Sequence, residues 1–85
     1  LVIDDERPDR ELIKSLLSTY CPFVEVVAEA ESVAQGQACI AKHKPEVVFL
    51  DIEMPTQNGF DLFKVLPNRN FLTVMTTGYD QYGIK

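Results

Sequence analysis

The sequence predicts an α/β fold built around a parallel β-sheet. Short apolar runs rich in β-branched residues alternate along the 85 residues with segments whose apolar residues recur at helical spacing. Two of these runs end in carboxylates: residues 1–3 precede Asp4 and Asp5, and residues 47–50 precede Asp51. Unbroken apolar runs are typical of strands buried on both faces, as in parallel sheets. The repeated order of strand and helix implies right-handed crossovers between parallel strands.

The first strand is predicted at residues 1–3, and Pro8 marks the start of the first helix, where its missing N–H is not needed. The apolar stripe of this helix comprises Leu12, Ile13, Leu16, Leu17 and Tyr20. Cys21-Pro22 ends the helix. A second strand is predicted over residues 23–28, and because it is less apolar than the first we expect it nearer an edge of the sheet.

A second helix is predicted to begin at Ser32, because Ser32 and Gln35 form a capping-box pattern. Its weak apolar stripe comprises Val33, Ala34, Ala38 and Ala41. Residues 42–45 supply a basic last turn and a proline stop.

The third strand is predicted at residues 47–50, directly before Asp51. A turn containing Pro55, Asn58 and Gly59 follows it. Further along the chain we predict a third helix over 60–66, a fourth strand over 72–77 and the beginning of a fourth helix over 79–85.

The composition is that of one globular domain, with 46% hydrophobic and 25% charged residues. The net charge of −5 argues against direct nucleic-acid contact by this segment, because such contacts need Lys and Arg. No apolar stretch approaches the length of a membrane span. Cys21 and Cys39 fit no metal or redox spacing, so we expect reduced cysteines and a cytoplasmic location.

The carboxylates at the strand ends are the candidate functional site. In open parallel sheets, ligands bind beyond the carboxyl ends of the strands, at the point where the strand order reverses. Two neighbouring strands would bring Asp4, Asp5 and Asp51 into one crevice. Three carboxylates that lie so near to one another repel each other, so the arrangement requires a cation. The sequence therefore predicts a metal site with one carboxylate available for chemistry.

Three linked motifs resemble the receiver domain of two-component response regulators. They are residues 4–6, residues 50–55 with Gly59, and Thr77-Gly78, and they occur in the family's order along the whole chain. Residues 76–85 are also similar to receivers attached to LytTR-type DNA-binding domains. The resemblance implies a flavodoxin-like, doubly wound parallel sheet that is truncated after the fourth strand.

This resemblance implies a phosphorylation switch and not an enzyme that releases a product. Asp51 would be the phosphoacceptor and would attack the phosphohistidine of a sensor histidine kinase. Asp5, Asp51 and the backbone carbonyl of Glu53 would bind Mg²⁺ directly, and Asp4 would hold a metal-bound water. Thr77 would hydrogen-bond the phosphoryl group and report its presence.

The resemblance also sets expectations for the rest of the protein. Residues 1–85 are expected to be a receiver domain that is incomplete at its C-terminus, where a fifth strand and helix would follow, and also at its N-terminus. Without that unit, the fourth strand would be a bare sheet edge and the first helix would expose part of its apolar stripe. The expected partners are a DNA-binding output domain of the same protein and, on phosphorylation, a second copy of the chain. No membrane contact is expected.

Four alternatives remain open. An Asp at a strand end can simply close a turn. Residues 50–53 faintly resemble the first motif of haloacid-dehalogenase-type phosphatases, in which Asp51 would be the nucleophile of a Mg²⁺-dependent enzyme; against this, Glu53 stands where those enzymes place a second Asp. A degenerate receiver would serve only as an interaction module. Finally, Thr76 competes with Thr77, because alternation along a strand sends only one of the two side chains to the site; the place of Thr77 at the strand's end favours it.

Overall fold

The computed structural model describes residues 1–54, 57–66 and 70–76. Four strands form one parallel sheet in the order β2-β1-β3-β6. These strands are β1 (Val2–Ile3), β2 (Glu29–Ala30), β3 (Val47–Leu50) and β6 (Leu72–Met75). A separate antiparallel pair consists of β4 (Glu53–Met54) and β5 (Gln57–Asn58). The predicted α/β fold with a parallel sheet is confirmed.

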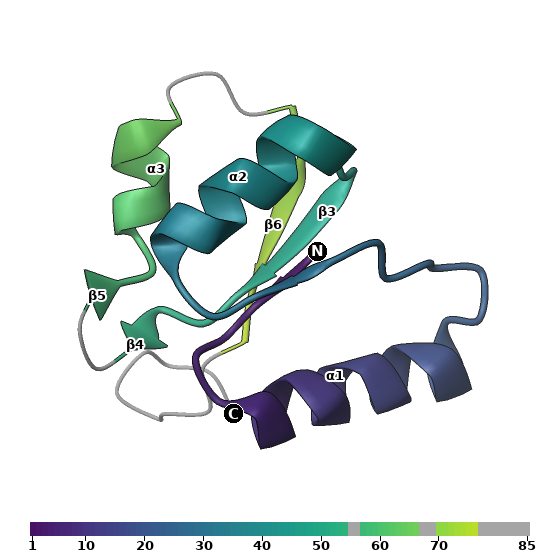
Figure 1. Cartoon of the computed structure of the whole chain (residues 1–85). Helices are drawn as coiled ribbons and strands as arrows, with labels where there is room; N and C mark the ends of the chain where they lie inside the picture. The colour runs from purple at the N-terminus through teal and green to yellow at the C-terminus, as the bar shows by residue number, and fades with distance from the viewer. Residues whose placement is uncertain (55–56, 67–69, 77–85) are drawn as a thin grey trace.

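Helices cover the two faces of the sheet unequally. The helices are α1 (Arg7–Tyr20), α2 (Val33–His43) and α3 (Asp61–Val65). Figure 1 shows α2 and α3 on one face of the sheet and α1 on the other. From β1 the chain moves to β2 on one side, and it returns to place β3 and β6 on the other. The strand order therefore reverses between β1 and β3, which is where a parallel sheet forms its ligand crevice.

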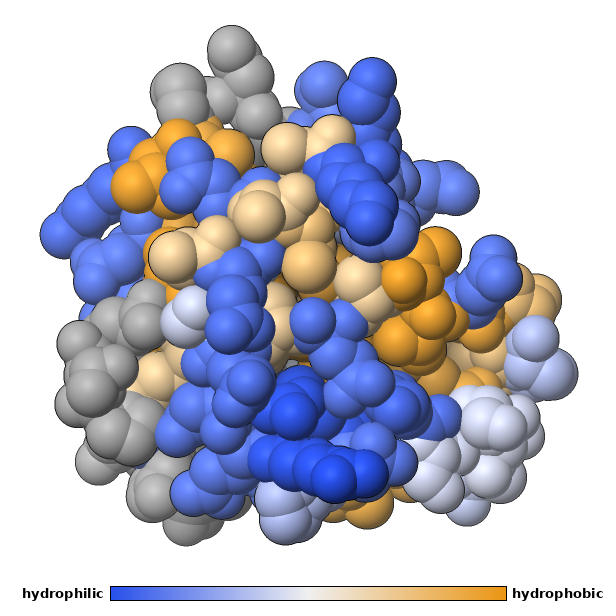
Figure 2. Space-filling view, viewed as in Figure 1, coloured by the Kyte–Doolittle hydropathy of each residue, from blue (hydrophilic) through white to orange (hydrophobic). Residues whose placement is uncertain are grey.

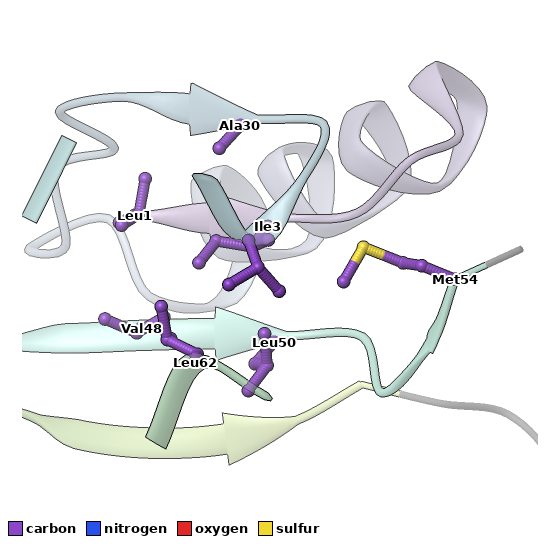
Figure 3. Packing of buried hydrophobic residues seen from close by; sticks show 8 residues of the cluster. Leu1, Ile3, Ala30, Val48, Leu50, Met54 and Leu62 are labelled. Atoms are coloured by element: carbon purple, nitrogen blue, oxygen red, sulfur yellow. The ribbon is translucent and has the colours of Figure 1, made fainter. Parts of the chain in front are cut away.

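The main core lies between the sheet and the pair α2 and α3. Ile3, Val48, Leu50 and Leu62 are fully buried there, and Figure 3 shows their side chains converging from strands and helix. Val48 and Leu50 lie two residues apart in β3, so both side chains point to the same face of the sheet. This apolar layer fixes the register of β1 against β3.

Helix α2 packs closely against the sheet through a face that the sequence did not reveal. Its buried residues are Val33 and Gly36, whereas Ala34, Ala38 and Ala41 of the predicted stripe are exposed. A Cβ atom at Gly36 would lie 2.5 Å from Cδ1 of Ile3, so a larger residue would require the buried Ile3 side chain to shift. Of the predicted stripe only Val33 is buried, and the prediction missed Gly36 because a glycine carries no hydropathy signal.

The predicted capping of α2 is confirmed. The Gln35 N–H donates to Oγ of Ser32 at 3.1 Å, and Oε1 of Gln35 accepts from the Glu31 N–H at 3.0 Å. Lys44 is the C-cap of the helix: it adopts the left-handed conformation (φ 48°) and donates its N–H to the Ile40 carbonyl. Sequence signals at helix ends are local, which explains why they were read correctly.

Helix α1 presents a mixed face to the sheet. Its half-buried residues are Arg10, Ile13, Lys14 and Leu17. Three members of the predicted stripe are exposed instead: Leu12 at 58%, Leu16 at 47% and Tyr20 at 75%. No residue of α1 is fully buried. Two cations and two aliphatic side chains therefore hold the helix against the sheet.

The predicted second strand over 23–28 was wrong. The strand that pairs with β1 is Glu29–Ala30. Within the predicted segment, only Ala28 bonds to β1, through its carbonyl, which accepts from the Val2 N–H at 3.2 Å. Because β1 has two residues, it offers few backbone groups for pairing. In the segment 23–28, Phe23 is 86% and Val27 41% exposed, whereas Val24, Val26 and Ala28 are half-buried. Figure 2 shows hydrophobic side chains gathered where this segment runs.

The remaining predictions fall into three groups. The third helix is confirmed as the shorter Asp61–Val65, and the fourth strand as Leu72–Met75. The turn predicted after Asp51 is a small hairpin of β4 and β5. The predicted fourth helix over 79–85 lies outside the described residues.

Cys21 and Cys39 are both free thiols. Among the helices of the described residues, none combines the length and apolar character required to cross a bilayer.

The close contact at Gly36 predicts a sharp difference between two helix substitutions. Gly36→Val should lower the free energy of unfolding by about 1–3 kcal/mol, because the added atoms overlap the buried Ile3 side chain. Ala38→Val on the exposed side of the same helix is the matched control and should cost only about 0.5 kcal/mol of helix propensity. Urea denaturation checks both; equal losses would contradict the packing described here.

Candidate metal centre

The pairing of β1 with β3 places the acidic residues side by side. Val2 is paired with Phe49 and Ile3 with Leu50, so Asp4 and Asp51 come next on neighbouring strands. The Asp51 N–H donates to the Ile3 carbonyl at 3.0 Å, which carries the alignment up to the strand end. The core register therefore determines the position of both carboxylates.

Both aspartates close a turn with one carboxylate oxygen. Oδ1 of Asp4 accepts from the Glu6 N–H at 2.9 Å, and Oδ1 of Asp51 accepts from the Glu53 N–H at 2.9 Å. These are Asx turns, in which a side chain bonds to the backbone two residues ahead. The simple turn-forming role weighed from the sequence is thus real. It does not exclude a metal, because each carboxylate has a second oxygen.

Asp4, Asp5 and Asp51 form one cluster. Each offers an oxygen within 4.8 Å of the others. Asp4 is 3% exposed and Asp51 9% exposed, while Asp5 lies at the half-buried opening. Within residues 1–54, 57–66 and 70–76, no Lys or Arg forms an ion pair with these carboxylates. The three acids that the sequence predicted to converge do so.

Burial and mutual repulsion make the charged cluster unfavourable. Burial raises the pKa of Asp4 to about 6, despite the Glu6 N–H bond, and the charges of Asp51, Asp9 and Asp5 add to the rise. Burial also raises the pKa of Asp51, against the Glu53 N–H bond and with help from the charges of Asp5 and Asp9. A bound cation would remove this penalty, and hard divalent cations prefer carboxylate oxygens. The residues present fit such a cation.

Gly59 brings the following turn against the backbone of Asp51. Its N–H donates to the Ile52 carbonyl at 3.1 Å. A Cβ atom at this position would overlap the Asp51 carbonyl oxygen and lie 2.7 Å from Cα of Ile52. The turn can lie this close to the acidic residue only because residue 59 is glycine.

The other predicted site residues are placed less completely. Glu53 is the first residue of β4 and is half-buried. Its N–H donates to the Asp51 carboxylate. Thr77 lies outside the described residues. Thr76 donates its N–H to the Leu50 carbonyl at 3.0 Å, and its buried Oγ1 has no hydrogen-bond partner in the described part of the chain.

Two residues near the cluster were missed by the sequence reasoning. Asp9 lies on the first turn of α1 and raises the pKa values of Asp4, Asp51 and Glu6. Arg10 donates from a guanidinium nitrogen to the Asp4 carbonyl at 2.8 Å. The available signal was periodicity, because residues 6, 9, 10 and 13 share one side of a helix.

Comparison with known proteins gives a consistent result. The response regulator receiver domain model matches residues 1–84. The sensory transduction protein LytT of Enterococcus faecalis is 40% identical over 87 residues, which cover all of this chain and 36% of that protein. The transcriptional regulatory protein BtsR of Escherichia coli is 34% identical over 86 residues, again 36% of its length. The chain therefore spans about a third of these curated relatives.

A solved structure shows the same fold. The response regulator domain of CheB from Thermotoga maritima has a TM-score of 0.76 and 28% identity, and the alignment covers 87% of this chain and 55% of that one. Its similarity supports the flavodoxin-like arrangement of parallel strands and helices.

The raised pKa of Asp4 predicts how the stability of the metal-free protein depends on pH. Because the folded pKa of about 6 exceeds the usual value of 3.8, the folded state binds the proton more tightly. The free energy of unfolding should therefore fall as pH rises from about 4 to 6, and remain low above that range. Asp4→Asn should flatten this dependence and stabilise the protein at pH 8 by on the order of 1 kcal/mol, because a neutral amide is less costly to bury than a carboxylate.

Urea denaturation in EDTA at several pH values measures this effect. Glu25→Gln, which changes an exposed acid away from the cluster, is the control and should keep the wild-type pH dependence. An unchanged pH dependence in Asp4→Asn would rule out Asp4 as its source.

Proposed function

The chain belongs to the receiver domain family of response regulators, and on that premise we propose that Asp51 is the residue that accepts a phosphoryl group. One observation supports this assignment above the others: Asp51 is the acid at the centre of the sheet, beside Asp4 and Asp5 and at the end of β3. The site faces the point where the strand order reverses. The domain acts as a phosphorylation switch in two-component signalling.

The phosphoryl donor is the phosphohistidine of a sensor histidine kinase. The Asp51 carboxylate attacks the phosphorus in line, and the new O–P bond forms as the N–P bond of phosphohistidine breaks. The histidine nitrogen leaves with the electron pair. Asp51 must be ionised for this attack, although burial raises its pKa. Asp51 is oriented by the hydrogen bond that its N–H donates to the Ile3 carbonyl and by the one that its Oδ1 accepts from the Glu53 N–H.

The cation of the site is Mg²⁺ in this proposal. Asp5, Asp51 and the Glu53 backbone carbonyl would hold it directly, and Asp4 would hold it through water. The bound cation would supply positive charge that keeps Asp51 ionised and offsets the charge of the incoming phosphoryl oxygens. The sparse protein ligand set suits Mg²⁺, which retains several waters when bound by proteins.

Thr77 is the residue proposed to bind the phosphoryl group and to report its presence. A threonine hydroxyl can donate to a phosphoryl oxygen, and a change in its position on phosphorylation would report the phosphoryl group to the rest of the protein. The switch would act on an output domain of the same protein, DNA-binding in type, and through a homodimer formed on phosphorylation. The kinship with LytT and with a transcriptional regulatory protein supports that output. We place this signalling in the cytoplasm.

The relatives also decide between the alternatives weighed from the sequence. They are response regulators, which favours the switch over a haloacid-dehalogenase-type phosphatase. The clustered acids support a working receiver over a degenerate one, because Asp4, Asp5 and Asp51 are all present and lie together.

Acetyl phosphate with Mg²⁺ should add a single phosphoryl group to the protein, and Asp51→Asn should abolish the addition. The amide has no ionised oxygen with which to attack. Intact-mass spectrometry measures the gain, with Asp61→Asn as the control because Asp61 pairs with Lys64 and is not part of the Asp4-Asp5-Asp51 cluster. A phosphoryl adduct of wild-type yield on Asp51→Asn would sink the assignment.

Mg²⁺ should bind weakly in the absence of phosphate, and Asp5→Ala should weaken binding more than Asp4→Ala. A direct ligand contributes more than one that acts through water. The Asp4 change also relieves repulsion in the empty site, which offsets part of its loss. Titration of the two variants, followed by amide chemical shifts in NMR spectra, gives the order; the reverse order would reject this ligand assignment.

A further inference from the structure

Arg10 forms a bridge between three elements of the structure. One guanidinium nitrogen donates to the Asp4 carbonyl at 2.8 Å, and Nε pairs with Oε1 of Glu29 at 3.1 Å. Arg10 belongs to α1, Glu29 to β2, and Asp4 follows β1. The Arg10 side chain is only 11% exposed, and its bond to the Asp4 carbonyl is partly buried, whereas its bond to Glu29 lies at the surface.

The bond from Arg10 takes the place of a missing hydrogen bond between β1 and β2. The Asp4 N–H still donates to the Ala30 carbonyl at 3.0 Å, so in a continued parallel ladder the Asp4 carbonyl would accept from residue 32. Ser32 instead caps α2 and turns away from β1. The buried Asp4 carbonyl thus has no strand partner, and Arg10 supplies the donor. An unpaired buried carbonyl is costly, so this bond is needed to hold the strand end in place.

The same helix contains a close comparison. Lys14 lies one turn beyond Arg10 and donates to Oε2 of Glu29 at 2.7 Å and to Oε1 of Glu11 at 3.0 Å. It therefore shares the contact with β2 but makes no bond to Asp4. Arg10 differs because its planar fork presents two donors in fixed geometry, one for each partner. Lysine has a single ammonium and cannot reproduce this bridge.

We propose that Arg10 is a positioning residue of the metal site, which holds the Asp4-Asp5 segment in register with Asp51 by bonding the Asp4 carbonyl, while its pairing with Glu29 holds the guanidinium in place. This inference rests on the proposed metal site. Asp4 is then fixed through three groups: its N–H by Ala30, its side chain by the Glu6 N–H and its carbonyl by Arg10. Asp5 follows on this fixed backbone. Mutation of residues that orient metal ligands typically weakens metal binding by about 10- to 100-fold.

The test compares Mg²⁺ affinity with stability in the same variants. Arg10→Gln should raise the dissociation constant for Mg²⁺ about tenfold, because the Asp4-Asp5 segment loses its anchor. Arg10→Lys should lie between this variant and the wild type. Lys14→Gln breaks the same link to Glu29 without touching Asp4, and should bind Mg²⁺ like the wild type. NMR titrations give the constants, at a temperature where circular dichroism shows each variant folded.

A destabilised variant with an intact site separates positioning from general stability. Ile40→Ala shortens a half-buried side chain that packs on the core from the last turn of α2, and it should lower the melting temperature while leaving Mg²⁺ affinity unchanged. Acetyl phosphate labelling of Arg10→Gln should be slow at low Mg²⁺ and approach the wild-type rate at saturating Mg²⁺. If Arg10→Gln and Arg10→Lys both melt earlier but bind Mg²⁺ as the wild type does, Arg10 is structural only and the inference is wrong. If the wild type itself binds no Mg²⁺, the proposed metal site fails first and this inference with it.

Discussion

The alignment of β1 with β3 is the constraint on which the rest of the structure depends. The register that buries Ile3 and Leu50 in the core also sets Asp4 beside Asp51 at the rim. Because side chains alternate between faces, a slip of one residue would send the carboxylates into the apolar layer and the aliphatic residues out of it. The hydrophobic free energy of the core therefore holds together charges that repel each other. The fold and the site are two results of one pairing.

This dependence explains what the sequence could predict. The strands β1 and β3 are short apolar runs followed at once by acids, so local pattern and strand geometry place Asp4, Asp5 and Asp51 together without further knowledge. The cap of α2 at Ser32 is equally local. The pairing segment of β2 and the inner faces of α1 and α2 are different, because they are chosen by contacts with β1 that lie far away in the sequence. Apolar residues in 23–28 gave the wrong strand for that reason.

The surroundings of the site were less predictable than its acids. Gly59 could be named as a turn residue, but its contact with the Asp51 backbone requires the position of the hairpin. Arg10 and Asp9 appear in the sequence as ordinary charges at the start of a helix. Their influence on Asp4 depends on where α1 lies relative to the sheet, and α1 is placed by a mixed polar and apolar face that hydropathy does not display.

The acidic cluster shows why such a site needs support from several directions. Burial raises the pKa values of Asp4 and Asp51, so the folded protein without a cation loses stability at neutral pH through these groups. Each aspartate is nevertheless held by an Asx turn and by sheet hydrogen bonds, which cannot relax without breaking the core register. A cation that binds only the folded state would then stabilise the fold by the repulsion it removes. Metal affinity and conformational stability are coupled through the same backbone bonds, and the strength of that coupling depends on how rigidly the strand ends are held.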